Sequence, residues 1–376
     1  MNRLLAFSWI LVFTAGPPLR SVGADPAPVQ IESATVDSLY DNLFLPQDRG
    51  WLGADGAVSI PLSPTRVLWI FGDTMVGTLS KQKGRQGMMP RNTIAIQDLS
   101  EGPPGEVEFF WDLSDNIIGD FFPPDPWDAG YWYWPGVGEL IDGDLFLFMY
   151  KIVSGEGDNA FSFELDDLTL FRIPNPQDSP REWTWTTRNL GWVGPHQGFA
   201  SAIQVEPPYV YLLGYDDNLA KERSMVLSRV RIEDLKSKEP EKGFEFWVKG
   251  NGGCEWGREP KDLEPLFQPG VTESSIHYNQ KFNRYIAITH HAFDPWMLLT
   301  SAPKITGPWS EPVKVYQIPE MLEKKERHAY AMKAHPELAT VSDELVVTYV
   351  VNTSDFWSMF QDTEIYYPRF VRVKLK

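Results

Sequence analysis

The sequence has a single cysteine, Cys254, and fewer basic than acidic side chains, 34 Lys and Arg against 51 Asp and Glu. One cysteine cannot form an internal disulfide, so the fold must be held by core burial. The formal net charge of −17 argues against a nucleic-acid surface, because phosphate recognition depends on clustered Lys and Arg. We therefore expect no nucleic-acid partner.

Long apolar runs are equally scarce. The one such run, residues 4–16, follows Arg3 and precedes the small residues Gly23 and Ala24, which is the pattern of a secretory signal peptide. It is shorter than the ~20 residues that cross a bilayer. We predict a signal peptide over residues 1–24, no membrane span, and a secreted or periplasmic bacterial protein.

Helical periodicity and several common catalytic motifs are missing. Only residues 319–328 combine good helix formers into a predicted helix. The lack of a G-x-S-x-G elbow argues against a lipase-type serine hydrolase. The glycine-rich residues 250–257 lack the Gly-Lys-Ser/Thr of a phosphate loop. Five histidines fall in the last third of the chain, but none has a zinc-site spacing. We predict no metal ligands and no cofactor, and no sequence pattern supports a channel-bound calcium or other ion.

What the sequence does contain is turns and short strands. It has 31 Pro and 29 Gly, and β-branched or aromatic runs each follow another plausible strand across a turn. The clearest turn is Asp142-Gly143, between two apolar runs, which predicts a hairpin. The second strands of the five pairs are residues 67–71, 145–150, 209–213, 285–289 and 345–350.

This pair recurs five times along the chain. Its first strands align on positions about 60 to 85 residues apart, a spacing that leaves room for about four strands in each repeat. We therefore predict an all-β, five-bladed β-propeller in a single domain over residues 25–376, with the segment before Trp51 closing the ring. A two-sheet sandwich is the alternative, but it does not require a fivefold recurrence. The aligned positions are Asp55, Glu139, Ser201, Glu273 and His335.

Two of these positions and one neighbour carry the chemistry we expect. In a propeller the first strand of each blade lines the central channel, so the aligned residues converge. Glycoside hydrolysis needs a carboxylic acid and a carboxylate, often with a third acid that tunes them. We predict Asp55 as base or nucleophile and Asp73 or Glu273 as acid. Asp55 and Asp73 fall at one rim of a predicted hairpin; the alternative is that each caps its own turn.

Further residues are predicted to bind substrate. Glu139 and His335 lie on predicted inner strands, where a solvated carboxylate and a hydrogen-bonded core histidine are the alternatives. Trp132 and Trp134 belong to an aromatic cluster whose rings could stack on sugars or form a buried core. We also assign His196 to substrate binding.

Several segments resemble a known family. LWIFGDTMVG at residues 68–77, ADGAVSI before it, ESSIHYNQKFNRYIAI at residues 273–288 and the C-terminal HPEL, ELVVTYVVNTS and YYPRFVRVKL carry the resemblance. Together they resemble a bacterial domain-of-unknown-function family of secreted five-bladed β-propellers with an FGDT motif. That family includes endo-acting D-arabinanases, and its fold is similar to arabinanase and invertase-type glycosidases. The likeness covers nearly all of residues 45–376.

The resemblance implies that Asp55 and Asp73 fall where that family has its catalytic acids, with Glu273 and His335 on inner strands that face its channel. The resulting hypothesis is a secreted glycoside hydrolase that acts on a polysaccharide, of arabinan type. The alternatives are a noncatalytic glycan-binding propeller of the cell envelope and a structural or partner-binding envelope protein.

Overall fold

The computed structural model describes residues 27–80, 82–114, 117–127, 129–156, 162–194, 196–219, 222–291 and 293–376. The predicted signal peptide, residues 1–24, lies outside them. The described chain is all-β, as predicted. In these ranges no helix is long and apolar enough to cross a membrane. The α-helices are short: α1 (Ser38–Asp41), α2 (Ile232–Leu235), α3 (Pro319–Glu323) and α4 (Ser358–Gln361).

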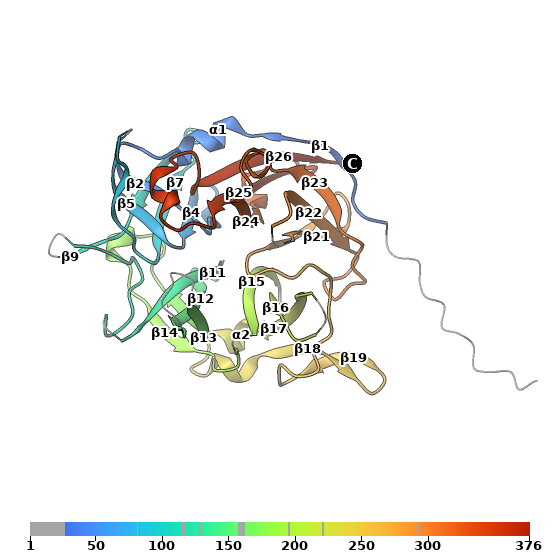
Figure 1. Cartoon of the computed structure of the whole chain (residues 1–376). Helices are drawn as coiled ribbons and strands as arrows, with labels where there is room; N and C mark the ends of the chain where they lie inside the picture. Colours follow the sequence, from blue (N-terminus) through green and yellow to red (C-terminus); the bar gives the residue numbers. More distant parts are fainter. Residues whose placement is uncertain are drawn as a thin grey trace, which may run out of the picture.

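Five antiparallel sheets of four or five strands are arranged about a common centre (Figure 1). Each is built mainly from consecutive strands of the chain. The strands of each sheet are given from the centre outwards. The first sheet is β3 (Val58–Ser63), β4 (Arg66–Phe71), β7 (Thr93–Asp98) and β8 (Glu106–Phe110), and the second is β11 (Tyr131–Ile141), β12 (Asp144–Ser154), β13 (Phe163–Ile173) and β14 (Thr186–Asn189). The third is β15 (Gln197–Glu206), β16 (Tyr209–Asp216), β17 (Ser224–Arg231), β18 (Glu245–Gly250) and β19 (Gly253–Gly257). The fourth is β20 (Ser275–Asn279), β21 (Arg284–His290), β22 (Trp296–Ala302) and β23 (Val313–Gln317), and the fifth is β24 (Arg327–Ala334), β25 (Glu344–Thr353), β26 (Pro368–Leu375) and β1 (Ile31–Val36).

Two smaller sheets are inserted into the first repeat. One is three-stranded, with β5 between β2 and β6, and the other is a two-stranded ribbon. Their strands are β2 (Arg49–Ala54), β5 (Thr74–Ser80) and β6 (Gly84–Met88), and β9 (Asp112–Ser114) and β10 (Ile117–Gly119).

All five predicted strand pairs are present as antiparallel neighbours: β3 with β4, β11 with β12, β15 with β16, β20 with β21, and β24 with β25. The hairpin turn between β11 and β12 is also confirmed, because Asp142 and Gly143 both have positive φ, 50° and 91°. A segment before Trp51 closes the ring as predicted, since β1 pairs with β26 and joins both chain ends in one sheet.

The predicted helix over residues 319–328 is too long. α3 ends at Glu323, and His328 lies in β24. Arg327 is buried and makes ion pairs with Glu323 and Asp362, while β24 takes its backbone hydrogen bonds from β25. Strand pairing and these ion pairs override the local helix propensity.

The core lies between neighbouring sheets. One buried cluster joins Leu68 and Ile70 of the first sheet to Leu145 of the second, and another joins Phe146 of the second to Leu212 of the third. The first strands of successive sheets also contact one another, β3 with β11, β11 with β15, β15 with β20, and β20 with β24. Side chains of these innermost strands therefore meet at the centre.

Candidate active site

Two cavities lie along the innermost strands. The larger, which we call the acid cavity, has a volume of about 800 Å³. Every one of the five sheets contributes to it at the start of its innermost strand. The contributing residues are Asp55 before β3, Trp134 in β11, His196 before β15, Glu273 before β20 and Tyr330 in β24.

The smaller, the channel cavity, has a volume of about 380 Å³ and is lined further along the same strands. Its polar lining comprises Ser59, Glu139, Gln204, Ser274, Ser275, His277, Lys333, His335 and Glu337. One set of strands therefore builds two cavities in succession.

Asp55 and Asp73 share one rim, as the hairpin argument predicted. β3 and β4 are antiparallel, with Val58 opposite Ile70. The segment before β3, which carries Asp55, and the segment after β4, which carries Asp73, therefore meet at the same edge. The Gly72 N–H donates to the Asp55 carbonyl oxygen at 3.0 Å. A Cβ at Gly72 would lie 2.3 Å from Asp55 Oδ1, so a glycine in this position makes room for the carboxylate.

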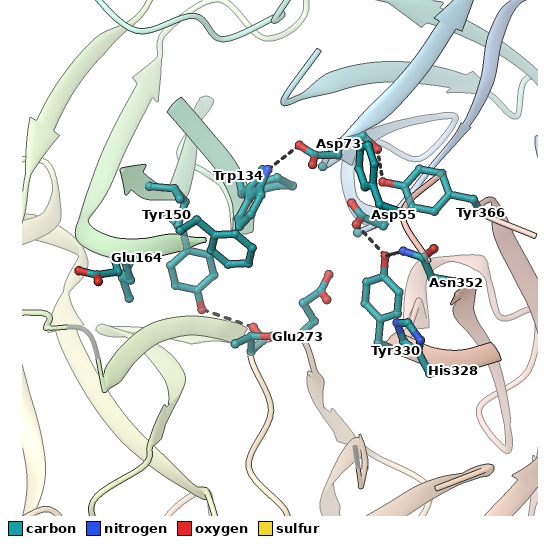
Figure 2. Close-up of a pocket in the computed structure, with 18 of the residues that line it drawn as sticks. Asp55, Asp73, Trp134, Tyr150, Glu164, Glu273, His328, Tyr330, Asn352 and Tyr366 are labelled. Carbon is teal, nitrogen blue, oxygen red and sulfur yellow. Dashed lines mark hydrogen bonds between the residues drawn. The ribbon is translucent and has the colours of Figure 1, made fainter. Parts of the chain in front are cut away.

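The two carboxylates have different partners. Asp73 Oδ1 accepts a hydrogen bond from Trp134 Nε1 at 2.7 Å, and its Oδ2 lies 3.2 Å from Arg91 Nη1. Asp55 Oδ2 accepts a hydrogen bond from the Tyr330 hydroxyl at 2.8 Å (Figure 2). The Asp73 side chain therefore does not cap its own turn, which was the alternative reading for this residue.

Burial raises the pKa of Asp73, and the Arg91 charge and the Trp134 hydrogen bond oppose that rise. Burial, together with the negative charges of Asp73 and Glu273, raises the pKa of Asp55 well above its usual range. An ion pair favours the charged form of a carboxyl, and a neighbouring carboxylate disfavours it. Of the two, Asp73 is therefore the group that ionises first.

Glu273 reaches the same cavity from the fourth sheet, on the side away from Asp73 in Figure 2. It precedes β20 rather than lying on it, which corrects the strand position expected from the sequence. Burial raises its pKa, and the only opposing charge from the described residues is Lys333. The Lys333 side chain is itself buried, with Nζ 3.5 Å from the Ser274 carbonyl oxygen, and burial lowers its pKa to about 8.

Trp134 and His196, two of the predicted substrate-binding residues, line the acid cavity. Trp132 does not. Its ring packs against Trp134 with centroids 5.8 Å apart, and the Arg91 guanidinium lies 4.6 Å from its centroid. Trp132 therefore supports the two groups that contact Asp73, and its prediction as a residue facing the substrate is corrected.

Glu139 and His335 line the channel cavity and not the acid cavity. His335 Nδ1 lies 2.5 Å from Ser59 Oγ and Nε2 lies 2.7 Å from Thr348 Oγ1, while burial lowers the pKa of the ring to about 3. His335 is thus the hydrogen-bonded core histidine of the alternative reading. Burial raises the pKa of Glu139 to about 7. Glu139 lies on β11 as predicted, but His335 directly follows β24, which corrects its expected strand position. Both residues lie too far along the channel to meet the three acids.

Ser201, the remaining aligned position, is fully buried and donates a hydrogen bond to the Val271 carbonyl oxygen at 2.8 Å. It packs between the third and fourth sheets and lines neither cavity.

Three residues in or near the acid cavity were not predicted from the sequence: Arg91, Tyr330 and Lys333. Arg91 lies in a loop with no local pattern. Tyr330 and Lys333 lie on either side of an irregularity in the pairing of β24 with β25, where Ala331 has a φ of 54°. Such a bulge re-aims side chains, and simple alternation along the strand cannot reveal it.

In the ranges that the structure describes, no three His, Cys, Asp or Glu side chains are grouped so that they could hold a metal ion. The absence of a cofactor stays a prediction.

Comparison with known structures shows that the fold occurs among glycoside hydrolases. The chain is 19% identical to a Bacteroides ovatus protein, itself only provisionally described as a hydrolase, with a TM-score of 0.73 and 90% of each chain covered. It is 11% identical to an exo-β-1,3-galactanase of Phanerochaete chrysosporium solved with β-1,3-galactotriose, with a TM-score of 0.50, 91% of this chain and 64% of that chain. An α-L-arabinofuranosidase from Lactobacillus brevis is also similar, at 11% identity, a TM-score of 0.47, and 86% and 90% coverage.

Residues 37–375 match the family described as Domain of unknown function (DUF5005), and the chain belongs to that family. No curated protein sequence matches it significantly.

Proposed function

We propose that the protein is a secreted five-bladed β-propeller that hydrolyses glycosidic bonds in a polysaccharide. The observation that carries this proposal is the convergence of Asp55, Asp73 and Glu273 in one cavity of about 800 Å³. Each of the five sheets contributes to that cavity, which supports counting them as five blades. The fold shared with a galactanase supports carbohydrate as the substrate class, and the pattern of residues 1–24 supports secretion.

Asp73 suits the role of the ionised carboxylate. Arg91 and Trp134 both stabilise its charged form, so it can attack the anomeric carbon or activate a water molecule. This differs from the role derived from the sequence, which gave base or nucleophile to Asp55. The sequence could not distinguish the two, because it does not show which carboxyl has the arginine.

Glu273 suits the general acid. Its pKa is raised by burial, it faces Asp73 across the cavity, and buried Lys333 is the one opposing charge among the residues that the structure describes. The proton of Glu273 would pass to the glycosidic oxygen as the bond between that oxygen and the anomeric carbon breaks. Asp55, whose pKa is raised well above its usual range, would be the third acid that tunes this pair. Trp134 and His196 would contact the sugar.

The substrate we favour is an arabinan-type polymer, because the sequence resembles a family that contains arabinanases. The likeness to a galactanase makes β-1,3-galactan the second polymer to test.

The test is an assay of the purified protein on soluble arabinan, β-1,3-galactan and xylan, with released sugars measured. Glu273→Gln should lose most activity on the polymer but retain activity on an aryl glycoside whose leaving group needs no proton. Glu164→Gln is the matched control, because Glu164 is an exposed carboxylate at the same cavity and should lose less than tenfold. Binding without sugar release by the wild-type protein would instead support a noncatalytic glycan-binding propeller.

A further inference from the structure

Exposed aromatic rings lie beside the acid cavity in two rows. In the first row Phe293, which is 75% exposed, lies with its ring 5.7 Å from that of His328. His328 lines the acid cavity and stacks on Tyr330, with centroids 5.8 Å apart and planes 28° from parallel. Tyr330 in turn donates to Asp55. The row therefore leads from solvent to the catalytic carboxylates.

The second row begins on the segment after β25. Phe356 lines the acid cavity, and the ring of Trp357, 73% exposed, lies 5.3 Å from it. Phe360 flanks the same indole at 5.8 Å. Each row thus runs from a residue of the cavity wall to a solvent-exposed ring, Phe293 in the first row and Trp357 in the second.

The segment that carries Trp357 is held firmly in place. Arg85 on β6 is only 3% exposed, and its guanidinium donates to the carbonyl oxygens of Met359, Asp362 and Ile365 at 2.6 to 2.8 Å. Ser358 Oγ also donates to Asp355 at 2.7 Å. A ring on an anchored segment loses little conformational entropy when a ligand stacks on it.

We propose that Phe293, His328, Phe356 and Trp357 form an aromatic shelf that runs from the wall of the acid cavity out to solvent and binds further sugar units, so that the substrate is a neutral polysaccharide chain and not a single terminal sugar. This inference rests on the proposed function, because the shelf extends the same site. Planar apolar rings match the apolar faces of sugar rings. The surrounding acids and the net charge of −17 disfavour a uronate-rich chain, and continuity with the acid cavity favours a glycan over a protein partner.

The test compares two substrates in Phe293→Ala and Trp357→Ala. One is the polymer among soluble arabinan, β-1,3-galactan and xylan that the wild-type protein cleaves best, and the other is an aryl monoglycoside of its sugar. The ratio of kcat/KM for the polymer to that for the monoglycoside should fall about tenfold in each variant, mainly through KM. Tyr278→Ala is the control, since Tyr278 is 38% exposed at the end of β20 away from the acid cavity, and its ratio should not change.

Binding separates failure of the shelf from failure of the enzyme. Affinity electrophoresis in gels that contain each of the three polymers gives a readout that needs no turnover. Retardation of the wild-type protein that Trp357→Ala weakens, without any sugar release, supports the shelf and removes the catalytic proposal. Hydrolysis with an unchanged substrate ratio in both alanine variants overturns the shelf and leaves catalysis standing. Neither retardation nor hydrolysis on any of the three polymers overturns both.

Discussion

The acid cavity and the channel cavity are built from the same five innermost strands, yet their polar groups are arranged in opposite ways. In the acid cavity, Asp55, Asp73 and Glu273 approach from separate loops and face open space. In the channel cavity, Ser59 joins His335 to Glu337 in a closed network, which Thr348 extends on the far side of the ring. The first arrangement leaves carboxylates available to a ligand. The second bonds Ser59, His335, Glu337 and Thr348 to one another, although neither ring nitrogen of the neighbouring His277 has a hydrogen-bond partner among the described residues.

The difference teaches that an inward-facing polar residue on an innermost strand does not by itself mark a reactive site. Its depth along the strand matters as much as its direction. Asp55 and Glu273 precede their innermost strands and Asp73 follows β4, so all three catalytic candidates lie outside the paired segments of these strands. Glu139 and His335 lie deeper, and His335 bonds directly to Ser59 and Thr348.

The largest expected effect is on the acid cavity. Asp73→Asn keeps the size and most hydrogen bonding of the side chain but removes its charge, so turnover of the polymer should fall by about 10²–10⁴-fold. Released sugars measure it, and melting curves should show little change in stability. Near-wild-type turnover in this variant would remove Asp73 from the mechanism and weaken the contrast between the cavities.

The channel cavity should respond through stability. His335→Ala takes away the side-chain partner of Thr348 Oγ1 and leaves Ser59 with Glu337 alone, which should lower the free energy of unfolding by about 2–3 kcal/mol. Urea unfolding measures the loss, and kcat at a permissive temperature should change far less than in Asp73→Asn. A large loss of kcat with unchanged stability would mean that the channel cavity takes part in catalysis.

Lys333 lies between the two cavities and links them. Its charge opposes the raised pKa of Glu273, and a general acid works only below its pKa. In Lys333→Met the pKa of Glu273 should rise further, so the alkaline limb of the pH–rate profile should move up by about one unit. A limb that stays in place would show that another group controls it.

The smallest effect concerns Glu139. Its pKa of about 7 in the folded protein exceeds the ordinary value of 4.5, so stability should be full below pH 4.5 and fall as the pH rises to about 7. Because the cavity lets water reach the carboxyl, the loss should be only about 1 kcal/mol. Glu139→Gln should remove this part of the pH dependence, as the difference between urea midpoints at pH 5 and pH 8 would show. An unchanged difference would contradict it.

The sequence predicts the strand pairs because their signals are local. The Asp142-Gly143 turn fixes one hairpin, and the FGDT segment places Asp73 beside Asp55 through simple antiparallel geometry. The match over residues 37–375 shows membership of the DUF5005 family, while the FGDT motif as a family mark and activity on arabinan stay predictions.

The rest of the site depends on contacts that no local pattern encodes. Arg91 reaches Asp73 from a loop, and Lys333 reaches Glu273 from another sheet across a strand irregularity. Trp132 and Trp134 alternate with Tyr133 along one strand and look equivalent in the sequence, but only Trp134 lines the cavity. Which of two similar rings faces a ligand is decided by tertiary packing.

β1, the first strand of the described residues, pairs with β26, the last, so the fifth sheet is complete only when the C-terminal strand is present. Until the C-terminal residues arrive, the fifth sheet lacks both of its outer strands, and β25 has a free edge. Aromatic packing of Tyr40 and Phe44 on Phe370, at 5.5 and 5.3 Å, holds the N-terminal segment only once that strand is present. A chain shortened at either end would expose a row of unpaired backbone groups, the kind of edge that recruits strands from other molecules. Ring closure therefore requires that strands from both ends of the described chain meet in the fifth sheet.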